Sequence, residues 1–262
     1  MKARIDDVKK MMKAVCMVII CIWKKATVYK IHQGRYEREI EEILKKPCER
    51  VVVWNSSFGW NVTLFQRPQH IARALAQKGT LVFYEVTPYT DPEVESYKKL
   101  EEGLYLLNRL NTEACEILFE KLAHKEIHKY MQIYSTELEV SANDLERYQK
   151  NGYTILYEYI DDINPDISVT KEIPENIQQK YEYVMRNADI PVVVTADKLK
   201  EDVERKRGKD NMAFSTNGVD YDHFVNFREM MEVTISEKYQ KIVNSGKIII
   251  GYYGALATWF DY

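Results

Sequence analysis

Residues 51–86 read VVVWNSSFGWNVTLFQRPQHIARALAQKGTLVFYEV, and this stretch decides the fold. It opens with a short apolar run, passes through a loop into an amphipathic stretch closed by Gly79, and ends on a second apolar run. Continuous apolar runs joined by an amphipathic helix are typical of parallel strands that are buried on both faces. The stretch therefore predicts a βαβ crossover in a Rossmann-like, doubly wound α/β domain.

The same alternation continues as far as residue 215. We predict strands at 51–54, 81–86, 104–107, 132–135, 154–158, 191–195 and 212–215. We predict helices at 67–78, 112–130, 142–150, 172–187 and 197–206, most of them followed by a Gly or Asn stop signal. Seven short strands with helices between them are enough for one open parallel sheet.

The first part of the chain carries a different pattern. An amphipathic helix is expected at 34–46, where apolar residues recur at helical spacing among Glu and Arg and Pro47 stops the run. We therefore assign residues 1–48 to an N-terminal helical extension and residues 49–246 to the main domain.

The last part of the chain also departs from the alternation. After the turn at 217–220 we expect a helix at 227–244 and a buried strand at 247–252, KIIIGY. A parallel strand needs neighbours to be stable. We therefore expect residues 247–262 to be the start of a second domain that is truncated here.

The composition is that of a folded and nearly neutral protein. The chain has 262 residues, 45% of them hydrophobic, and its 37 Lys and Arg against 40 Asp and Glu give a net charge of −3. This balance provides no global attraction to nucleic acid, so no nucleic-acid partner is expected. The four cysteines form no C-x-x-C pair and are too few for a disulfide scaffold, which favours reduced thiols in the cytoplasm.

The most apolar run is AVCMVIICIW at residues 14–23, and lysines flank it on both sides. Ten residues are too few to cross a bilayer core, which needs about 20. A helix packed on the protein is the favoured interpretation, and an interfacial anchor is the main alternative. A signal peptide is disfavoured because Lys24 and Lys25, rather than small residues, follow the run. A membrane contact through residues 14–23 would therefore be peripheral, at the inner face.

The loop at 55–66 follows the first strand, at the edge of the sheet where such domains bind ligands. It has one glycine where a dinucleotide fingerprint needs three, which disfavours a nicotinamide or flavin enzyme. Pro68 favours the first turn of a helix, whose free N–H groups together with Arg67 suit a phosphate or a sugar hydroxyl. His70 is a candidate hydrogen-bond donor in the same turn. The alternative is that Arg67 and His70 only cap and pack the helix.

Acidic residues end the fifth predicted strand, at 158–162, EYIDD. Carboxylates in this place can orient a hydroxyl group or act as a general base, although Asp is also common in ordinary turns. No second acidic cluster supports a metal site. His124 and His128 are spaced to share one helix, but we find no third ligand and interpret them as a solvated helix face.

Taken in order, several segments resemble the family 4 glycosyltransferases, which have the two-domain GT-B fold. The segments are QRPQHIARALA at 66–76, YEYIDD at 157–162, ADIPVVVT at 188–195 and NGVDYDHF at 217–224. Residues 248–261 are similar to the beginning of the second domain of that family.

The resemblance implies transfer of a sugar from a UDP- or GDP-sugar to a hydroxyl of a glycan or lipid-linked acceptor, in polysaccharide or cell-envelope synthesis. It implies no permanently bound cofactor and no metal. The candidate catalytic residues are Asp161, Asp162 and His70. The candidate substrate contacts are Phe58, Gly59, Trp60, Gln66, Arg67, Tyr159, Thr195, Asn217, Gly218, Asp220 and Gly254.

In that family the N-terminal domain mainly holds the acceptor and the C-terminal domain mainly holds the donor. This sequence contains little of a donor domain and lacks the paired-glutamate motif of the family. We therefore expect the acceptor-side half of a hexosyltransferase, inactive by itself. The alternative is a non-catalytic module that binds a glycan or a protein partner.

Overall fold

The computed structural model divides the chain into two compact units. The sheet domain comprises Met1–Asn164 and Ile173–Thr216, and the C-terminal unit comprises Pro165–Glu172 and Asn217–Tyr262. Within these units the structure describes residues 12, 15–16, 18–20, 22–24, 27–56, 58–167, 171–230 and 236–252.

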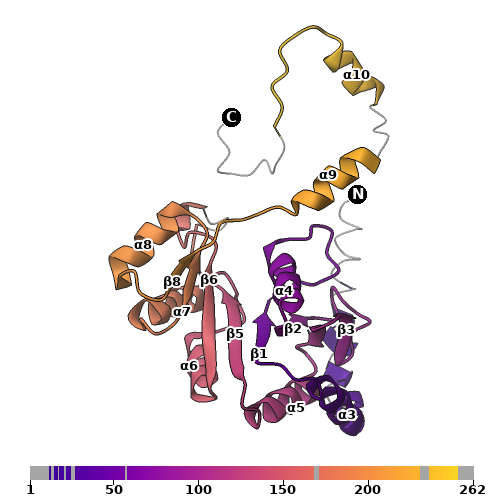
Figure 1. Cartoon of the computed structure of the whole chain (residues 1–262), viewed down its shortest axis with the longest axis vertical. Coiled ribbons are helices and arrows are strands. Elements are labelled where there is room, and N and C mark those ends of the chain that lie inside the picture. Colours follow the sequence, from indigo (N-terminus) through magenta and orange to yellow (C-terminus); the bar gives the residue numbers. More distant parts are fainter. Residues whose placement is uncertain are drawn as a thin grey trace. The chain divides into compact units, whose positions relative to one another are not determined.

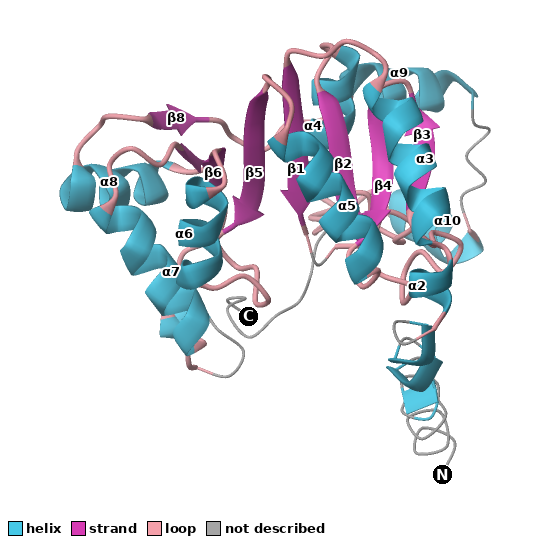
Figure 2. Ribbon diagram, turned by 90° about the horizontal axis from the view of Figure 1, so that it is seen from below, coloured by secondary structure: helices cyan, strands magenta, loops and turns pink. Residues whose placement is uncertain are grey.

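The sheet domain is built on one eight-stranded sheet in the order β3-β4-β2-β1-β5-β6-β7-β8 (Figures 1 and 2). Its strands are β1 (Arg50–Asn55), β2 (Leu81–Val86), β3 (Tyr97–Glu101), β4 (Leu104–Asn108), β5 (His128–Tyr134), β6 (Tyr153–Tyr159), β7 (Val192–Val194) and β8 (Met212–Phe214). Neighbouring strands pair in parallel except β3, which is antiparallel to β4. The predicted Rossmann-like α/β fold is confirmed.

Helices cover the two faces of the sheet unequally. The sheet domain contains α2 (Val28–Ile31), α3 (Gln33–Leu44), α4 (Arg67–Gln77), α5 (Thr112–Ala123), α6 (Ala142–Lys150), α7 (Glu175–Arg186) and α8 (Asp197–Arg207). Buried residues of α3, α5, α6, α7 and α8 form a large core on one face, whereas α4 packs on the other face with a smaller core. Right-handed crossovers explain the split, because the chain leaves β1 in one direction through α4 and β2 and later moves the opposite way from β5 to β8.

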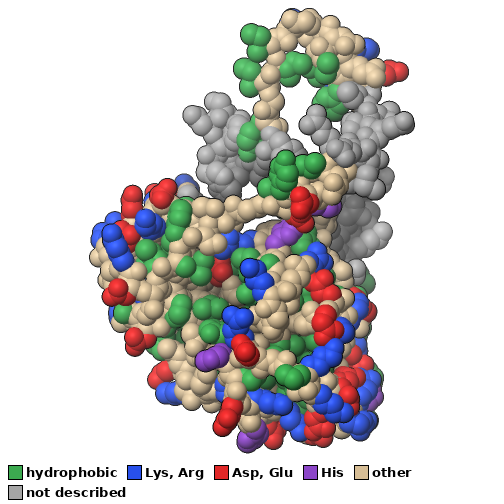
Figure 3. Space-filling model, viewed as in Figure 1, with side chains coloured by type: hydrophobic (Ala, Val, Ile, Leu, Met, Phe, Trp, Pro, Cys, Tyr) green, Lys and Arg blue, Asp and Glu red, His purple; other side chains and the backbone are tan. Residues whose placement is uncertain are grey.

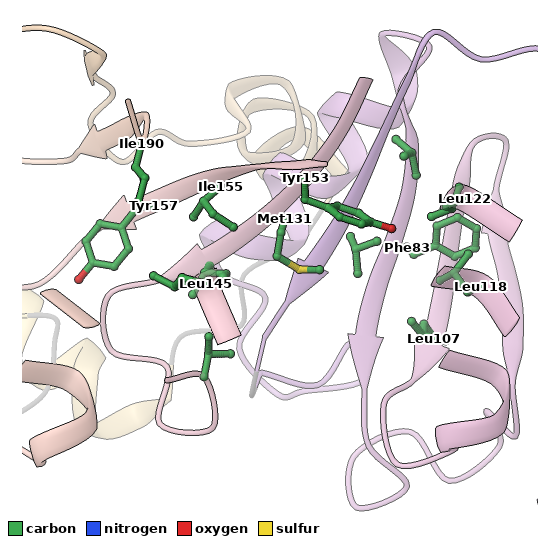
Figure 4. Packing of buried hydrophobic residues seen from close by; sticks show 14 of the residues in the cluster. Phe83, Leu107, Leu118, Leu122, Met131, Leu145, Tyr153, Ile155, Tyr157 and Ile190 are labelled. Atoms are coloured by element: carbon green, nitrogen blue, oxygen red, sulfur yellow. The ribbon is translucent and has the colours of Figure 1, made fainter. Parts of the chain in front are cut away.

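The large core contains the apolar residues that point to the same face of successive strands. Its members include Phe83, Leu107, Leu118, Leu122, Met131, Leu145, Tyr153, Ile155, Tyr157 and Ile190, shown in Figure 4. In β1, Val51 and Val53 join this core while Trp54 joins the smaller one. A central strand that is buried on both faces needs the continuous apolar run seen in the sequence.

The N-terminal helix α3 belongs to this same core. Tyr36, Ile40 and Leu44 lie on one side of α3 and are buried in the large core. The Tyr36 hydroxyl also donates a hydrogen bond of 2.8 Å to Glu95. The helix that the sequence places in an extension is thus part of what stabilises the sheet domain.

Two elements of the sheet domain differ from the predictions. The helix predicted at 112–130 ends at Ala123, and His128 begins β5, so the two histidines do not share a helix. Arg50 of β1 pairs with His128 in the parallel ladder, so β5 begins at His128. This pairing outweighs the helical spacing of apolar residues on which the prediction was based. The strand β3 was not predicted, because its half-exposed, lysine-containing sequence YKKLE is typical of an edge strand and lacks an apolar run.

The C-terminal unit also differs from the predictions. Instead of one helix at 227–244, its described residues form α9 (Tyr221–Met230) and α10 (Glu237–Val243), besides a 3-10 turn at Pro165–Ile167. The strand predicted at 247–252 is wrong, because this segment is irregular and Ile248 and Ile250 are 94% and 95% exposed. Within the described residues no other strand pairs with it, and a lone strand has no ladder to stabilise it.

Packing of α3 into the large core gives a test. Ile40→Ala should lower the free energy of unfolding by roughly 2–5 kcal/mol, because it leaves a cavity in a close-packed core. Arg38→Ala, on the exposed side of the same helix, should change it by less than about 0.5 kcal/mol. Urea unfolding followed by circular dichroism measures both, and equal effects of the two substitutions would contradict the packing of α3.

Candidate functional site

The strand order reverses between β1 and β5, and in open α/β sheets ligands bind beyond the carboxyl ends of the strands at this point. The loop after β1 leads into α4, which begins at Arg67. Tyr134 ends the neighbouring strand β5, and Tyr159 ends β6. These chain segments define the carboxyl edge of the sheet domain.

The loop after β1 is held in one shape by buried polar groups. Gln69, fully buried in α4, accepts a hydrogen bond of 3.1 Å from the Gln66 N–H and donates one of 2.9 Å to the Gly59 carbonyl. The buried Asp91 carboxylate accepts hydrogen bonds from the N–H groups of Trp60 and Asn61, at 2.9 and 3.0 Å. The loop is therefore anchored both to α4 and to the segment that follows β2.

Three predicted substrate contacts in this loop have structural roles. A Cβ atom on Gly59 would lie 2.1 Å from the Thr90 hydroxyl oxygen, so no larger residue fits at this close approach. Trp60 is buried in the smaller core, with its ring 5.2 Å from that of Tyr84. Gln66 precedes the first turn of α4. Their contact with a substrate stays a prediction.

A buried ion pair crosses the carboxyl edge. Arg67 Nη2 lies 3.0 Å from Glu158 Oε2, and the two side chains are only 13% and 3% exposed. Arg67 also donates to the Thr216 carbonyl at 3.1 Å, and Gln132 donates to the other oxygen of Glu158 at 2.6 Å. Burial raises the pKa of Glu158, and the Arg67 charge opposes this rise. One guanidinium thus joins α4, β6 and the segment after β8.

Two polar atoms beside this pair have no hydrogen-bond partner among the described residues. They are Gln132 Oε1 and Tyr134 Oη, both in buried side chains near the end of β5. Burial raises the pKa of Tyr134, and the charges of Glu158 and Asp161 add to the rise. The ring of Phe58 lies 6.2 Å from that of Tyr134. Asp161 is exposed at the rim, and partial burial raises the pKa of its carboxyl group. Its charge acts on Tyr134, which relates this acidic candidate to the cluster.

A cavity of about 390 Å³ opens beside the same cluster, on the face of the sheet that carries α4. Hydrophobic side chains gather in the surface between β8 and α4 in Figure 3, which has the view of Figure 1. The volume is within the range of small-molecule sites, about 300–1,000 Å³. The lining residues are Arg50, Val52, Arg67, Ile71, Leu75, Thr80, Tyr130, Gln132, Leu156, Glu158, Val193, Ala213 and Ser215.

The remaining predicted residues of the sheet domain are spread over several places. Tyr159 points into the large core, where its hydroxyl lies 3.3 Å from Asp202. Asp162 pairs with Lys198 at 2.7 Å, and the Thr195 hydroxyl donates to the Ile160 carbonyl at 3.0 Å. His70 is exposed on α4, with its ring 4.8 Å from that of Phe65.

The other predicted residues belong to the C-terminal unit. Asn217, Gly218 and Asp220 are exposed there, and Asp220 accepts a hydrogen bond of 3.1 Å from the His223 N–H at the start of α9. This is the usual role of an Asp at a helix start. Gly254 lies outside the described residues.

A second buried polar group lies at the carboxyl edge, on the side of the large core. Asn55 at the end of β1 donates a hydrogen bond of 2.7 Å to Glu85 in β2. Burial raises the pKa of Glu85 to about 7, against the opposing charge of Arg109. Arg109 itself is paired with Glu139 and lies 4.0 Å from Glu137.

Three residues of this edge, Gln132, Tyr134 and Glu85, were not predicted from the sequence. A usable signal was present, because Gln132 interrupts the apolar strand 130–134, YMQIY, and Glu85 interrupts 81–86, LVFYEV. A polar residue inside a buried strand has to find a partner or a ligand. Nothing in the sequence indicated that Gln132 meets Glu158, because that contact depends on the pairing of β5 with β6.

Comparisons with known proteins do not assign a family to this arrangement. No protein-family model matches the chain, and no curated protein matches it significantly. Within the described ranges, no group of three or more His, Cys, Asp or Glu side chains is placed to hold a metal ion.

The ion pair predicts an asymmetric response to substitution. Arg67→Ala should lower the free energy of unfolding by roughly 3–5 kcal/mol, because it leaves Glu158 charged, buried and unpaired. Adding Glu158→Gln should restore part of the loss, since the amide carries no charge. The control is Arg186→Ala, which removes an exposed pair with Glu182 and should cost at most about 1 kcal/mol. Chemical denaturation of the four proteins checks this, and no rescue by Glu158→Gln would contradict the charge-based cause.

Glu85 predicts a dependence of stability on pH. Its folded-state pKa, about 7, lies above its ordinary value of 4.5. The stabilisation is therefore fully present below about pH 4.5 and is lost as the pH rises through about 7, because the unfolded chain releases the proton first. Glu85→Gln should remove this slope and be more stable than the wild type at pH 7.5 by roughly 1–3 kcal/mol.

Measurements of unfolding between pH 5 and 7.5 check the Glu85 prediction. This range stays below the titration of the buried Lys180, whose pKa burial lowers to about 8. Parallel pH profiles for the wild type and Glu85→Gln would show that another group carries the slope.

Proposed function

We propose that the sheet domain is the acceptor-binding domain of a GT-B-type glycosyltransferase. The observation that carries the proposal is Gln132 Oε1, a buried polar atom without a partner among the described residues, whose side chain lines a cavity next to the point of strand reversal. Tyr134 Oη, two residues further along the same strand, is a second such atom. Order and spacing of the segments that resemble family 4 glycosyltransferases support the same class. The donor would be a UDP- or GDP-sugar, and the acceptor a glycan or a lipid-linked saccharide.

Carbohydrate chemistry fits these two atoms. A sugar hydroxyl can donate a hydrogen bond to Gln132 Oε1, and a sugar hydroxyl can accept one from the Tyr134 hydroxyl. Two hydroxyls of one sugar would therefore satisfy both groups. The amide orientation of Gln132 is set by its hydrogen bond to Glu158, which leaves Oε1 as the free acceptor. Aromatic rings such as Phe58 suit the apolar CH face of a sugar. The site would therefore recognise a saccharide rather than a purely apolar ligand.

Asp161 would act on the acceptor hydroxyl. Partial burial raises its pKa, which makes it a stronger base than an ordinary aspartate when it is ionised. Arg67 would act as a positioning residue, since its charge is paired with Glu158 and its hydrogen bonds hold the edge together. Groups that stabilise the charge on the leaving diphosphate would then belong to the donor side.

A second function is favoured by the same pairing of Arg67. With its charge neutralised by Glu158, Arg67 offers little to a nucleotide diphosphate, and a non-catalytic module that binds glycans needs no such charge. The two functions differ in turnover: the module would bind saccharides and leave nucleotide-sugars intact.

The test uses the complete gene product with a panel of nucleotide-sugars and saccharide acceptors. We expect acceptor-dependent release of UDP or GDP, and Asp161→Asn should lower kcat/KM by roughly 100-fold or more, as for loss of a general base. Asp210→Asn, an exposed aspartate in a loop, is the matched control and should leave the rate unchanged.

The outcomes separate the two functions. Saccharide binding that Tyr134→Phe and Gln132→Leu weaken, without any release of UDP or GDP, would favour the binding module. Turnover unaffected by Asp161→Asn would remove Asp161 from the mechanism. Neither binding nor turnover with a folded protein would overturn both proposals.

A further inference from the structure

The N-terminal segment exposes an unusual amount of apolar surface. Every described residue between 12 and 24 is helical. The large hydrophobic side chains among them are exposed, from 44% for Ile20 to 64% for Ile22: Met12, Val15, Val18, Ile19, Ile20, Ile22 and Trp23. The interpretation of this segment as a helix packed on the protein is therefore not what the described residues show.

The apolar surface is not confined to one face of the helix. Residues 14–23, AVCMVIICIW, contain no charged or amide side chain, and the described ones among them, 15–16, 18–20 and 22–23, are helical. A helix that docks in a protein groove keeps a polar face toward water, whereas a helix that is apolar all round is stable only when it is surrounded. The segment thus requires an environment that is apolar on more than one side.

The charges that directly flank the segment, between Asp7 and Glu37, are of one sign. Between residues 8 and 36 there is no Asp or Glu, and the basic residues are Lys9, Lys10, Lys13, Lys24, Lys25, Lys30 and Arg35. Lysines close to an anionic lipid surface each contribute about 1 kcal/mol to attraction. Trp23 stands next to Lys24, the combination that favours the boundary between lipid tails and headgroups.

We propose that residues 12–24 form an interfacial membrane anchor that inserts into one leaflet of an anionic bilayer. As a helix, the ten apolar residues measure about 15 Å, half of a hydrocarbon core of about 30 Å. Among the described residues, no helix is both long enough and apolar enough to cross a membrane. The anchor rests on this segment alone and does not depend on the proposed glycosyltransferase function.

The test is flotation of the purified full chain with lipid vesicles. Vesicles of phosphatidylcholine with about 30% phosphatidylserine should carry the wild type upward, and vesicles of phosphatidylcholine alone should carry much less. Raising the salt concentration should weaken the binding to anionic vesicles, because salt screens the lysines. Ile19→Glu with Ile22→Glu should weaken the partition at least about tenfold, because two buried apolar side chains become charged.

A matched control adds the same two charges elsewhere. The side chains of Leu64 and Leu138 are 67% and 57% exposed, which is similar to the exposure of Ile19 and Ile22. The variant Leu64→Glu with Leu138→Glu should therefore float like the wild type. In this flotation experiment, a wild type that stays with the soluble fraction would overturn the anchor, and so would equal flotation of the two double variants.

Two further measurements test the alternative roles of the segment, which are pairing with a second copy of the chain and a cleaved signal peptide. Gel filtration without lipid tests for pairing with a second copy: a discrete oligomer that Ile19→Glu with Ile22→Glu disperses, without vesicle binding, would overturn the proposal. Intact mass of the protein from its native source tests for a signal peptide. Removal of residues 1–23 would likewise overturn it, and a retained N-terminus supports the anchor.

Discussion

The buried Arg67–Glu158 pair is the interaction on which the carboxyl edge depends. Arg67 is the first residue of α4, which among the described helices is the only one that packs with the smaller core. Glu158 lies on β6, two strands from β1 on the other side of the reversal point. Neither charge is tolerated alone inside the protein, so each requires the other in place. Gln132 satisfies the second oxygen of Glu158, and Thr216 holds Arg67 from the end of the sheet. The pair therefore ties together segments that are far apart in sequence.

The same edge carries polar groups that a purely structural sheet would replace with apolar residues. Glu85 retains its proton only near or below neutral pH, and Gln132 Oε1 and Tyr134 Oη have no partner among the described residues. Each such group costs stability relative to a well-packed apolar side chain. These groups lie at the point of strand reversal, where ligands bind in folds of this class, and recognition of a ligand would explain why they are kept there.

Sequence reasoning succeeded where one physical rule acts locally. Unbroken apolar runs such as Leu81–Val86 and the sharp stop at Gly79 predicted strands and helix ends, because burial on both faces and a left-handed backbone leave few alternatives. It failed where distant pairing decides. His128 joins β5 only because β1 is there to pair with it, and residues 247–252 remain irregular although their composition is that of a strand. The partners of Arg67 could not be predicted either, since Glu158 is 91 residues away.

An interfacial anchor and a saccharide site on one chain would make each other more effective. A lipid-linked acceptor is confined to the membrane surface, and a protein bound to the same surface meets it at a much higher effective concentration than in solution. A shallow site with two recognition atoms could then be sufficient, because it need not supply all the affinity itself. The cavity beside Gln132 has this character, because apolar side chains of the sheet and of α4 line it, with Arg67, Gln132 and Glu158 toward the carboxyl edge and Arg50 and Thr80 toward the opposite edge. Weak recognition of a soluble sugar together with strong dependence on the membrane would be the physical signature of this arrangement.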